Sequence, residues 1–319
     1  MRRILILSVL LFESSLLIMN VWGSSRVSFT SDRTGNLDIY MMDINGENLA
    51  NLTDHPSDDF SPTWSPDGRA FAYVSNRDGN PEIYVMDINT KDSRRLTNHR
   101  ATDINPAWSP NGKWIAFASN QARDHAADTD IYIMDVNGKK VQRLTNKGGH
   151  NSTPAWSPDG QWIAFRSTQD GIGGIHVMNA DGGKQRALTQ VSATSPTWAS
   201  NGKQIYFSSE MLGGVKVPTL FAVDVDGGNA QKLTNVEHAC EEPDASSDGQ
   251  WIAYVSVQEE NKGIYLIRAA GGGLRKLTQG PGQEFSPAWV PSAFGVSPSE
   301  NTQMVLWGML KRNTPHFVQ

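Results

Sequence analysis

One short pattern recurs along most of the chain and limits its possible folds more than any other feature. An apolar run, a Ser-Pro-Asp-Gly turn and a second apolar run occur in nearly the same letters at 61–73, 105–117 and 153–165. Six copies can be aligned, at successive intervals of 44, 48, 42, 46 and 45 residues. The aligned positions are Trp64, Trp108, Trp156, Trp198, Asp244 and Trp289. A period of this length predicts a repeat architecture in which each copy forms one supersecondary unit.

Each copy has the pattern of four short antiparallel strands. In the copy around Trp108, β-branched and aromatic residues are concentrated in 104–109, 113–119, 130–136 and 140–146. The first and second strands are joined by Ser-Pro-Asp-Gly, where Pro presets φ and Gly adopts the left-handed conformation. An Asn-Gly or Asp-Gly pair joins the third and fourth strands and favours a tight hairpin turn. The sequence therefore predicts a four-stranded meander in every copy.

The polarity of the four strands predicts how the copies assemble. The second strand is apolar on both faces, as in Trp114–Phe117, so both of its faces must be covered. The fourth strand, "KVQRLTN" at 140–146, is mostly polar and belongs near solvent. Six sheets that are buried at one side and wet at the other fit radial blades around a channel, which is a six-bladed β-propeller. A linear solenoid would need polar capping repeats at its ends, and the sequence shows none.

The two ends of the repeat region predict how the ring closes. "RVSFTS" at 26–31 matches the second strand of a copy, and "FSPAWV" at 285–290 matches a first strand. The last inner strand would then complete the first blade and leave no unpaired edge there. We therefore expect an all-β domain over 26–290. It is a six-bladed β-propeller of four-stranded antiparallel blades, closed by the C-terminal inner strand pairing with the N-terminal blade.

The segments outside the repeats differ in composition. Residues 1–25 combine Arg2 and Arg3 with apolar runs and a small-residue end, which is the layout of a secretory signal peptide. The alternative is an uncleaved membrane anchor, which Glu13 disfavours because an acidic residue is costly inside a bilayer. The leader predicts a periplasmic or extracellular protein. Residues 291–319 form a C-terminal extension whose apolar patch, Met304–Leu310, would add a strand or cover one face of the ring.

Composition and motifs exclude several classes of function. Net charge is −5 with scattered Lys and Arg, so the chain lacks the basic stripe that nucleic-acid-binding proteins need. The single cysteine, Cys240, rules out an internal disulfide and thiol-rich metal sites, and we expect it to be a small buried apolar residue. The sequence has no nucleophile elbow, phosphate-cradling Gly loop or His-Glu-x-x-His zinc motif. The expectation is a protein without catalytic activity.

The candidate binding residues fall on the face of the ring that receives the variable connections. The tight turns place short, uniform connections on one face, and function tends to reside in the variable loops of the other. Four histidines follow outer strands that end in Leu-Thr, and four polar residues stand five positions before the aligned positions. These candidates at the channel mouth are His55, Asp59, His99, Asp103, His150, Asn151, His238 and Glu284. No cofactor is expected, although imidazoles converging on the axis would suit a divalent metal; the alternative is that they are solvated loop side chains.

The repeat "PAWSPDGxxIAFxS…DIYxMDxNG…xRLT" resembles the WD-repeat-like propeller repeat of the TolB family, over all six copies from Arg26 to Val290. The resemblance implies a periplasmic protein whose propeller docks a peptidoglycan-associated lipoprotein. Proteins of that family also carry an N-terminal α/β domain, whereas here about 25 residues precede the first blade. Similar repeats occur in oligogalacturonate lyases, which have seven blades and hold a metal through histidines.

Three hypotheses of function follow. The leading one is an exported, non-catalytic, TolB-like propeller that binds a protein or cell-envelope ligand through its variable loop face. The second is a metal-dependent polysaccharide lyase or hydrolase that uses the histidines at the channel mouth. The third is a scaffold for a larger assembly, with the C-terminal extension as its docking element. The expected partner is an envelope protein or polysaccharide and not a nucleic acid, with membrane contact only if the leader is uncleaved.

Overall fold

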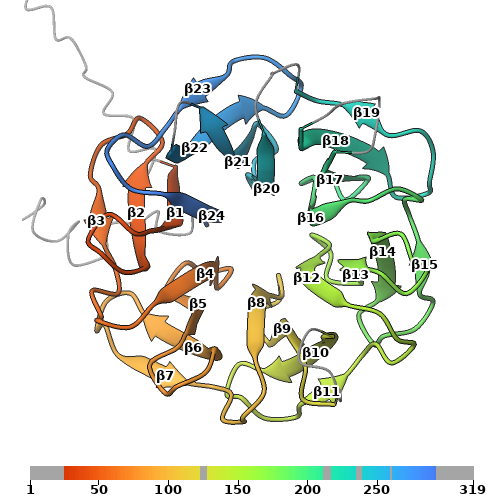
Figure 1. The fold of residues 1–319 in the computed structure, drawn as a ribbon, viewed down its shortest axis with the longest axis horizontal. Coiled ribbons are helices and arrows are strands. Elements are labelled where there is room, and N and C mark those ends of the chain that lie inside the picture. Colours follow the sequence, from red (N-terminus) through yellow and green to blue (C-terminus); the bar gives the residue numbers. More distant parts are fainter. Residues whose placement is uncertain (1–24, 123–127, 211–216, 235–238, 259–260, 292–319) are drawn as a thin grey trace, which may run out of the picture.

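The computed structural model describes residues 25–122, 128–210, 217–234, 239–258 and 261–291. Within these ranges every regular element is a β-strand, and the strands form six four-stranded antiparallel sheets around a central axis (Figure 1). The fold is the expected all-β, six-bladed propeller. Almost all of the predicted leader, and the C-terminal extension from residue 292, lie outside the described residues, so both stay predictions.

The blades follow one another in chain order. Blade 1 contains β1 (Arg26–Ser31), β2 (Asp38–Asp43), β3 (Ala50–Asn51) and, as its inner strand, β24 (Glu284–Val290). Blade 2 contains β4 (Asp59–Trp64), β5 (Ala70–Ser75), β6 (Glu82–Asp87) and β7 (Ser93–Arg95). Blade 3 contains β8 (Asp103–Trp108), β9 (Trp114–Ser119), β10 (Asp130–Asp135) and β11 (Gln142–Arg143).

The second half of the ring repeats this arrangement. Blade 4 contains β12 (Asn151–Trp156), β13 (Trp162–Ser167), β14 (Gly174–Asn179) and β15 (Arg186–Ala187). Blade 5 contains β16 (Thr194–Trp198), β17 (Gln204–Ser209), β18 (Thr219–Asp224) and β19 (Gln231–Lys232). Blade 6 contains β20 (Cys240–Ala245), β21 (Trp251–Gln258), β22 (Asn261–Arg268) and β23 (Arg275–Lys276).

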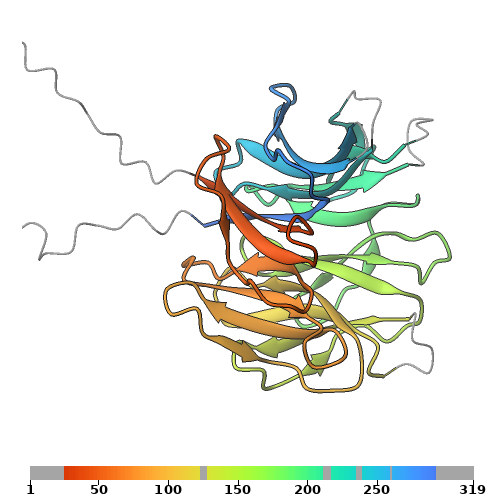
Figure 2. The same ribbon diagram turned by 60° about the vertical axis from the view of Figure 1, so that its left-hand side comes forward.

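The ring closes as the sequence predicts. Strand β24 pairs antiparallel with β1, with Arg26 opposite Val290 and Ser31 opposite Glu284. Figures 1 and 2 show β24 (blue) beside β1 (red), so segments from the two ends of the repeat region form one sheet. This pairing removes the two free sheet edges that an open array would expose.

Neighbouring blades are held together by apolar side chains of the middle strands. Between blades 1 and 2, Ile39 packs with Trp64, Phe71 and Tyr84 in one buried cluster, and five further clusters fill the other blade interfaces. The second strands are covered on both faces, as expected from their two-sided apolar pattern. Burying each large side chain of this kind contributes about 1.5–3 kcal/mol.

Two recurring sequence patterns have structural roles. In every blade the Thr after the outer strand accepts, through Oγ1, the N–H of an Ile or Leu near the start of the third strand, at 2.9–3.3 Å. In the Ser-Pro-Asp-Gly turn of blade 2, Ser65 Oγ donates to Asp67 Oδ1 at 2.6 Å and accepts the N–H of Ala70 at 3.0 Å. Gly68 takes the left-handed conformation, with φ of 66°. The repeated Ser and Asp therefore shape a turn, as the sequence predicts.

The register of blade 6 corrects one part of the alignment. Ala245 pairs with Ile252 in β21, just as Trp64 pairs with Phe71 in β5. The equivalent of the recurring tryptophan is therefore Ala245, and the expected assignment of Asp244 to that position is wrong by one residue. Blade 6 has no tryptophan at this position, so the spacing of the tryptophans could not fix its register.

Candidate functional site

The two faces of the ring differ as the sequence predicts. On one, here called the turn face, five residues separate the inner from the second strand in every blade from 2 to 6. On the other, the loop face, the connections between second and third strands vary from 2 residues after β21 to 10 residues after β9. The variable loops therefore stand above a uniform scaffold.

The inner strands begin at the loop face, and we call their first residues the mouth positions. They are Asp59, Asp103, Asn151, Cys240 and Glu284; in blade 5, where β16 begins one residue later, the equivalent position is Ala193. Four of these are candidate residues from the sequence, and the ring does bring them to equivalent places. Their side chains are enclosed, however, because only 0 to 3% of each of these four residues is exposed.

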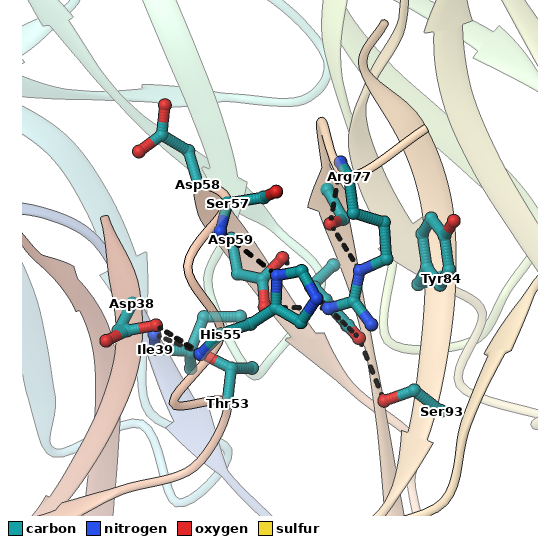
Figure 3. Close-up of polar contacts among 12 residues, drawn as sticks. Asp38, Ile39, Thr53, His55, Ser57, Asp58, Asp59, Arg77, Tyr84 and Ser93 are labelled. Atoms are coloured by element: carbon teal, nitrogen blue, oxygen red, sulfur yellow. Dashed lines mark hydrogen bonds and ion pairs between the residues drawn. The ribbon is translucent and has the colours of Figure 1, made fainter. Parts of the chain in front are cut away.

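Asp59, at the mouth position of blade 2, forms a buried ion pair. Its Oδ2 lies 2.9 Å from Nη2 of Arg77, which follows β5. The same guanidinium donates through Nε to Ser75 Oγ at 2.8 Å and lies 4.7 Å from the ring centroid of Tyr84. Figure 3 shows Arg77 between Asp59 and Tyr84, with His55 in the adjoining loop. Burial raises the pKa of Asp59, and the Ser75 hydroxyl and Arg77 act in the opposite direction.

Glu284 repeats this arrangement at the mouth position of blade 1. Its Oε1 lies 2.6 Å from Nη2 of Arg33, whose guanidinium lies 4.8 Å from the ring centroid of Tyr40. Burial raises the pKa of Glu284, and the positive charge of Arg33 opposes the shift. Arg33 and Arg77 occupy the same place after the second strand. Sequence reasoning missed both, although the repeated pattern Ser-x-Arg marks them.

Asp103 and Asn151 occupy the mouth positions of blades 3 and 4 without such an arginine. Gln121 stands where blades 1 and 2 have arginine. Burial raises the pKa of Asp103 to about 6, and its Oδ1 has no hydrogen-bond partner among the described residues. Asn151 instead donates through Nδ2 to Oδ1 of Asp130 at 3.1 Å. Among the carboxyl groups at the mouth positions, Asp103 is therefore the one whose negative charge is least compensated by its neighbours.

Three further buried acids, unrecognised in the sequence, begin the third strands of blades 1 to 3. They are Asp38, Glu82 and Asp130. Glu82 accepts from Nη2 of Arg95 at 2.7 Å and from the backbone N–H of His99 at 3.0 Å. Asp38 similarly accepts the backbone N–H of its own loop histidine at 3.3 Å. These acids tie the blade-to-blade loops to the sheets, and the recurring "DIY" or "EIY" is their sequence signal.

Two of the loop histidines contact their own loops, and a third contacts the connection that precedes β10. Nδ1 of His55 and of His99 accepts the backbone N–H of the residue two positions later, at 3.0 and 3.1 Å. Nδ1 of His150 lies 3.2 Å from Thr129 Oγ1, and His238 lies outside the described residues. In the part of the chain that the structure describes, no three His, Cys, Asp or Glu side chains are arranged to hold a metal ion.

Cys240, at the mouth position of blade 6, is fully buried, as the sequence predicts. Burial raises the pKa of its thiol to about 11. The neutral thiol therefore behaves as a small apolar side chain, since the reactive form of cysteine is the thiolate.

A cavity of about 550 Å³, here called the turn-face pocket, occupies the axial channel between the middle of the inner strands and the Ser-Pro-Asp-Gly turns. Each inner strand bulges there at a residue that precedes proline and has a left-handed φ of 45–54°. The bulge residues are Ser61, Asn105, Thr153, Ser195, Glu242 and Ser286. Such conformations are costly for residues other than glycine and persist because the surrounding packing imposes them.

Comparison with known proteins agrees with this geometry. The family described as TolB beta propeller domain matches residues 22–127 and 125–296. The Tol-Pal system protein TolB of Syntrophotalea carbinolica is 46% identical over 46 residues, which are 14% of this chain and 11% of that protein. Among the described residues, no helix is long and apolar enough to cross a bilayer.

Two solved structures share the fold. TolB from Acinetobacter baumannii has a TM-score of 0.73 at 24% identity, covering 83% of this chain and 66% of that one. A TolB-like protein from Agrobacterium tumefaciens has a TM-score of 0.68 at 21% identity, covering 83% and 92%. The chain thus matches less than two thirds of the length of the Syntrophotalea and Acinetobacter proteins. Because the family match extends over both halves of the propeller, the chain belongs to the TolB β-propeller family.

Proposed function

We infer that this protein is an exported, non-catalytic propeller that binds an envelope protein through its loop face. The observation that carries the proposal is the construction of that face. Variable loops stand above the buried carboxylates of the inner and third strands, most of which are held in ion pairs or backbone contacts, such as Asp59 with Arg77 and Glu82 with His99. A rigid scaffold that presents variable loops is suited to recognition, since little ordering entropy is lost on binding.

Membership of the TolB family favours a partner of the Tol-Pal type. The Syntrophotalea relative is named for the Tol-Pal system. A peptidoglycan-associated lipoprotein is therefore the first partner to test, with other envelope proteins or polysaccharides as further candidates. In this proposal, the eight candidate binding residues predicted from the sequence act in two ways. The exposed histidine His99 contacts the partner, and the buried residues such as Asp59 and Glu284 hold the loops.

A matched pair of charge-reversal variants tests which face binds. Arg100 and Lys147 are exposed on the loop face of the blade 2–3 and 3–4 connections, and Arg69 and Lys113 are exposed on the turn face of blades 2 and 3. The full-length protein is immobilised and titrated with the soluble domain of a peptidoglycan-associated lipoprotein and, separately, with envelope extract. We expect R100E/K147E to weaken saturable binding at least tenfold and R69E/K113E to change it less than twofold.

Either of two results would contradict the proposal. One is the absence of any saturable partner in the extract. The other is a loss of binding in the turn-face variant with full binding in the loop-face variant. Thermal unfolding of both variants shows whether each has kept its fold, because all four side chains are exposed and their replacement should leave the melting temperature unchanged.

Export is proposed from the leader at residues 1–25. Fractionation of cells that make the full-length chain, followed by N-terminal sequencing, distinguishes the two expected forms. A mature protein that begins near residue 24 in a soluble envelope fraction supports a cleaved signal peptide. A protein that keeps Met1 and sediments with membranes supports the uncleaved anchor, and a protein that stays in the cytoplasm contradicts export.

A further inference from the structure

Blade 6 differs from the other blades at three neighbouring positions of its inner strand. Elsewhere the bulge residue is uncharged, the position two residues later is Thr or Ala, and the next position is tryptophan. In β20 these three positions are Glu242, Asp244 and Ala245. Asp244 accepts the backbone N–H of Trp289 just as Thr63 accepts that of Trp108, so this bond between blades needs a hydroxyl oxygen and no charge. Together the three departures in β20 add two carboxylates to the channel and remove one indole.

All three residues line the turn-face pocket. The rest of the lining consists of prolines, small residues, hydroxyl-bearing residues and Asn105 from the inner strands and the turns that follow them, together with five tryptophans. The lining contains no Lys, Arg or His. The pocket is therefore uncharged on five sides and acidic on the sixth. Its volume of about 550 Å³ is in the range of small-molecule sites.

The two carboxylates have only neutral partners. Asp244 Oδ2 accepts the backbone N–H of Trp289 at 2.9 Å, and its Oδ1 accepts from Thr197 Oγ1 at 3.2 Å. Glu242 Oε2 accepts the backbone N–H of Ser286 at 2.6 Å. No ion pair involves either acid among the described residues. Burial raises the pKa of Asp244 to about 6, which is consistent with a carboxylate that lacks a positive neighbour.

We propose that the turn-face pocket binds a small organic cation. Its ammonium group lies beside Glu242 and Asp244, in the space that a tryptophan fills in the other blades, and its alkyl part packs against the indoles and prolines. Positive charge on the ligand compensates both carboxylates, and nearby indoles favour alkylammonium groups. This site lies at the opposite end of the channel from the loop face and does not depend on the proposed envelope partner.

Calorimetry with two isosteric probes tests the charge requirement. The full-length protein is titrated at pH 7.5 with choline and with its uncharged carbon isostere, 3,3-dimethyl-1-butanol. We expect choline to bind saturably and at least tenfold more tightly than the isostere, and raised NaCl to weaken choline binding. Equal affinity for the two compounds, or no saturable heat with choline, would overturn the proposal.

Three variants locate the site. The double variant E242Q/D244N keeps the volume and one acceptor oxygen on each side chain but removes the charge, and we expect it to bind choline at least tenfold more weakly. Ala245→Trp restores the residue of the other blades and should abolish binding by filling the space. Asp248→Asn, in the exposed turn of the same blade and outside the pocket lining, is the control and should bind normally. Unchanged choline binding by E242Q/D244N with a native melting curve would place the cation elsewhere and refute the assignment, whether or not A245W folds.

Discussion

Arg77 is the residue that allows Asp59 to lie fully buried beneath the loop face, because its guanidinium supplies the charge that solvent cannot. Replacing Arg77 by Leu leaves that carboxylate uncompensated, and we expect the free energy of unfolding at pH 7 to fall by about 3 kcal/mol. The double variant D59N/R77L removes both charges and should recover at least half of this loss. Urea unfolding of the two single variants and the double variant gives the coupling energy. If the losses in D59N and in R77L added up to the loss in the double variant, the coupling energy would be zero and the ion pair would contribute nothing.

Asp103 has the opposite effect on stability, because it is buried without a cation. Its folded-state pKa of about 6 lies above the ordinary 3.8, so between these values the folded protein holds a proton that the unfolded chain has released. Its contribution to the free energy of unfolding therefore falls as pH rises from about 4 to 6, and the loss persists at pH 7. We expect Asp103→Asn to stabilise the protein by about 1–2 kcal/mol at pH 7 and by little at pH 4. Urea unfolding at both pH values measures the difference, and an equal effect at the two would contradict the assignment.

At the scale of the elements, the hairpin turns on the turn face differ in how closely they approach the neighbouring blade. Gly138 and Gly227 occupy equivalent turns, with φ of 76° and 92°. A Cβ on Gly138 would lie 2.5 Å from the carbonyl oxygen of Leu96 in blade 2, whereas a Cβ on Gly227 meets nothing within 4 Å. We expect Gly227→Ala to cost about 1 kcal/mol through its backbone conformation alone. Gly138→Ala should cost about 2 kcal/mol more because two blades must move apart. If urea unfolding gave similar losses of unfolding free energy for the two variants, blades 2 and 3 would be able to move apart at this contact without a measurable cost.

These elements also show how far the sequence could predict the structure. The strands, the turns and the closure by β24 follow from a repeated pattern, because six copies report on the same local conformation. The ion pairs of Arg33 and Arg77 could not be predicted from the sequence, because their acids lie on a different strand and the contact exists only in the folded sheet. The register of β20 was predicted one residue out, because Ala245 gives no tryptophan to align. The constant proline of the inner strand, Pro243 here, would have fixed it.

The six described blades form a ring whose closure depends on β24, the last strand along the described part of the chain. Without β24, strand β1 would have an unpaired edge, Glu284 would no longer compensate Arg33, and blade 6 would lose its neighbour Trp289. The blade interfaces form a closed circle of apolar clusters, so opening one of them exposes side chains of both flanking blades. A closed ring of this kind is expected to unfold as one cooperative unit, in contrast to a linear repeat array.

Two truncations separate the contribution of the closing strand from that of the C-terminal extension. A chain that ends at residue 291 keeps β24 intact, and we expect it to unfold in one sharp transition within about 3 °C of the full-length protein. A chain that ends at residue 283 lacks β24, and we expect a broad transition or aggregation, because two apolar blade faces and a strand edge become exposed. Scanning calorimetry and gel filtration measure both. A sharp, native-like transition in the shorter chain would show that the six blades do not depend on closure, and a large loss in the longer one would place the extension within the folded ring.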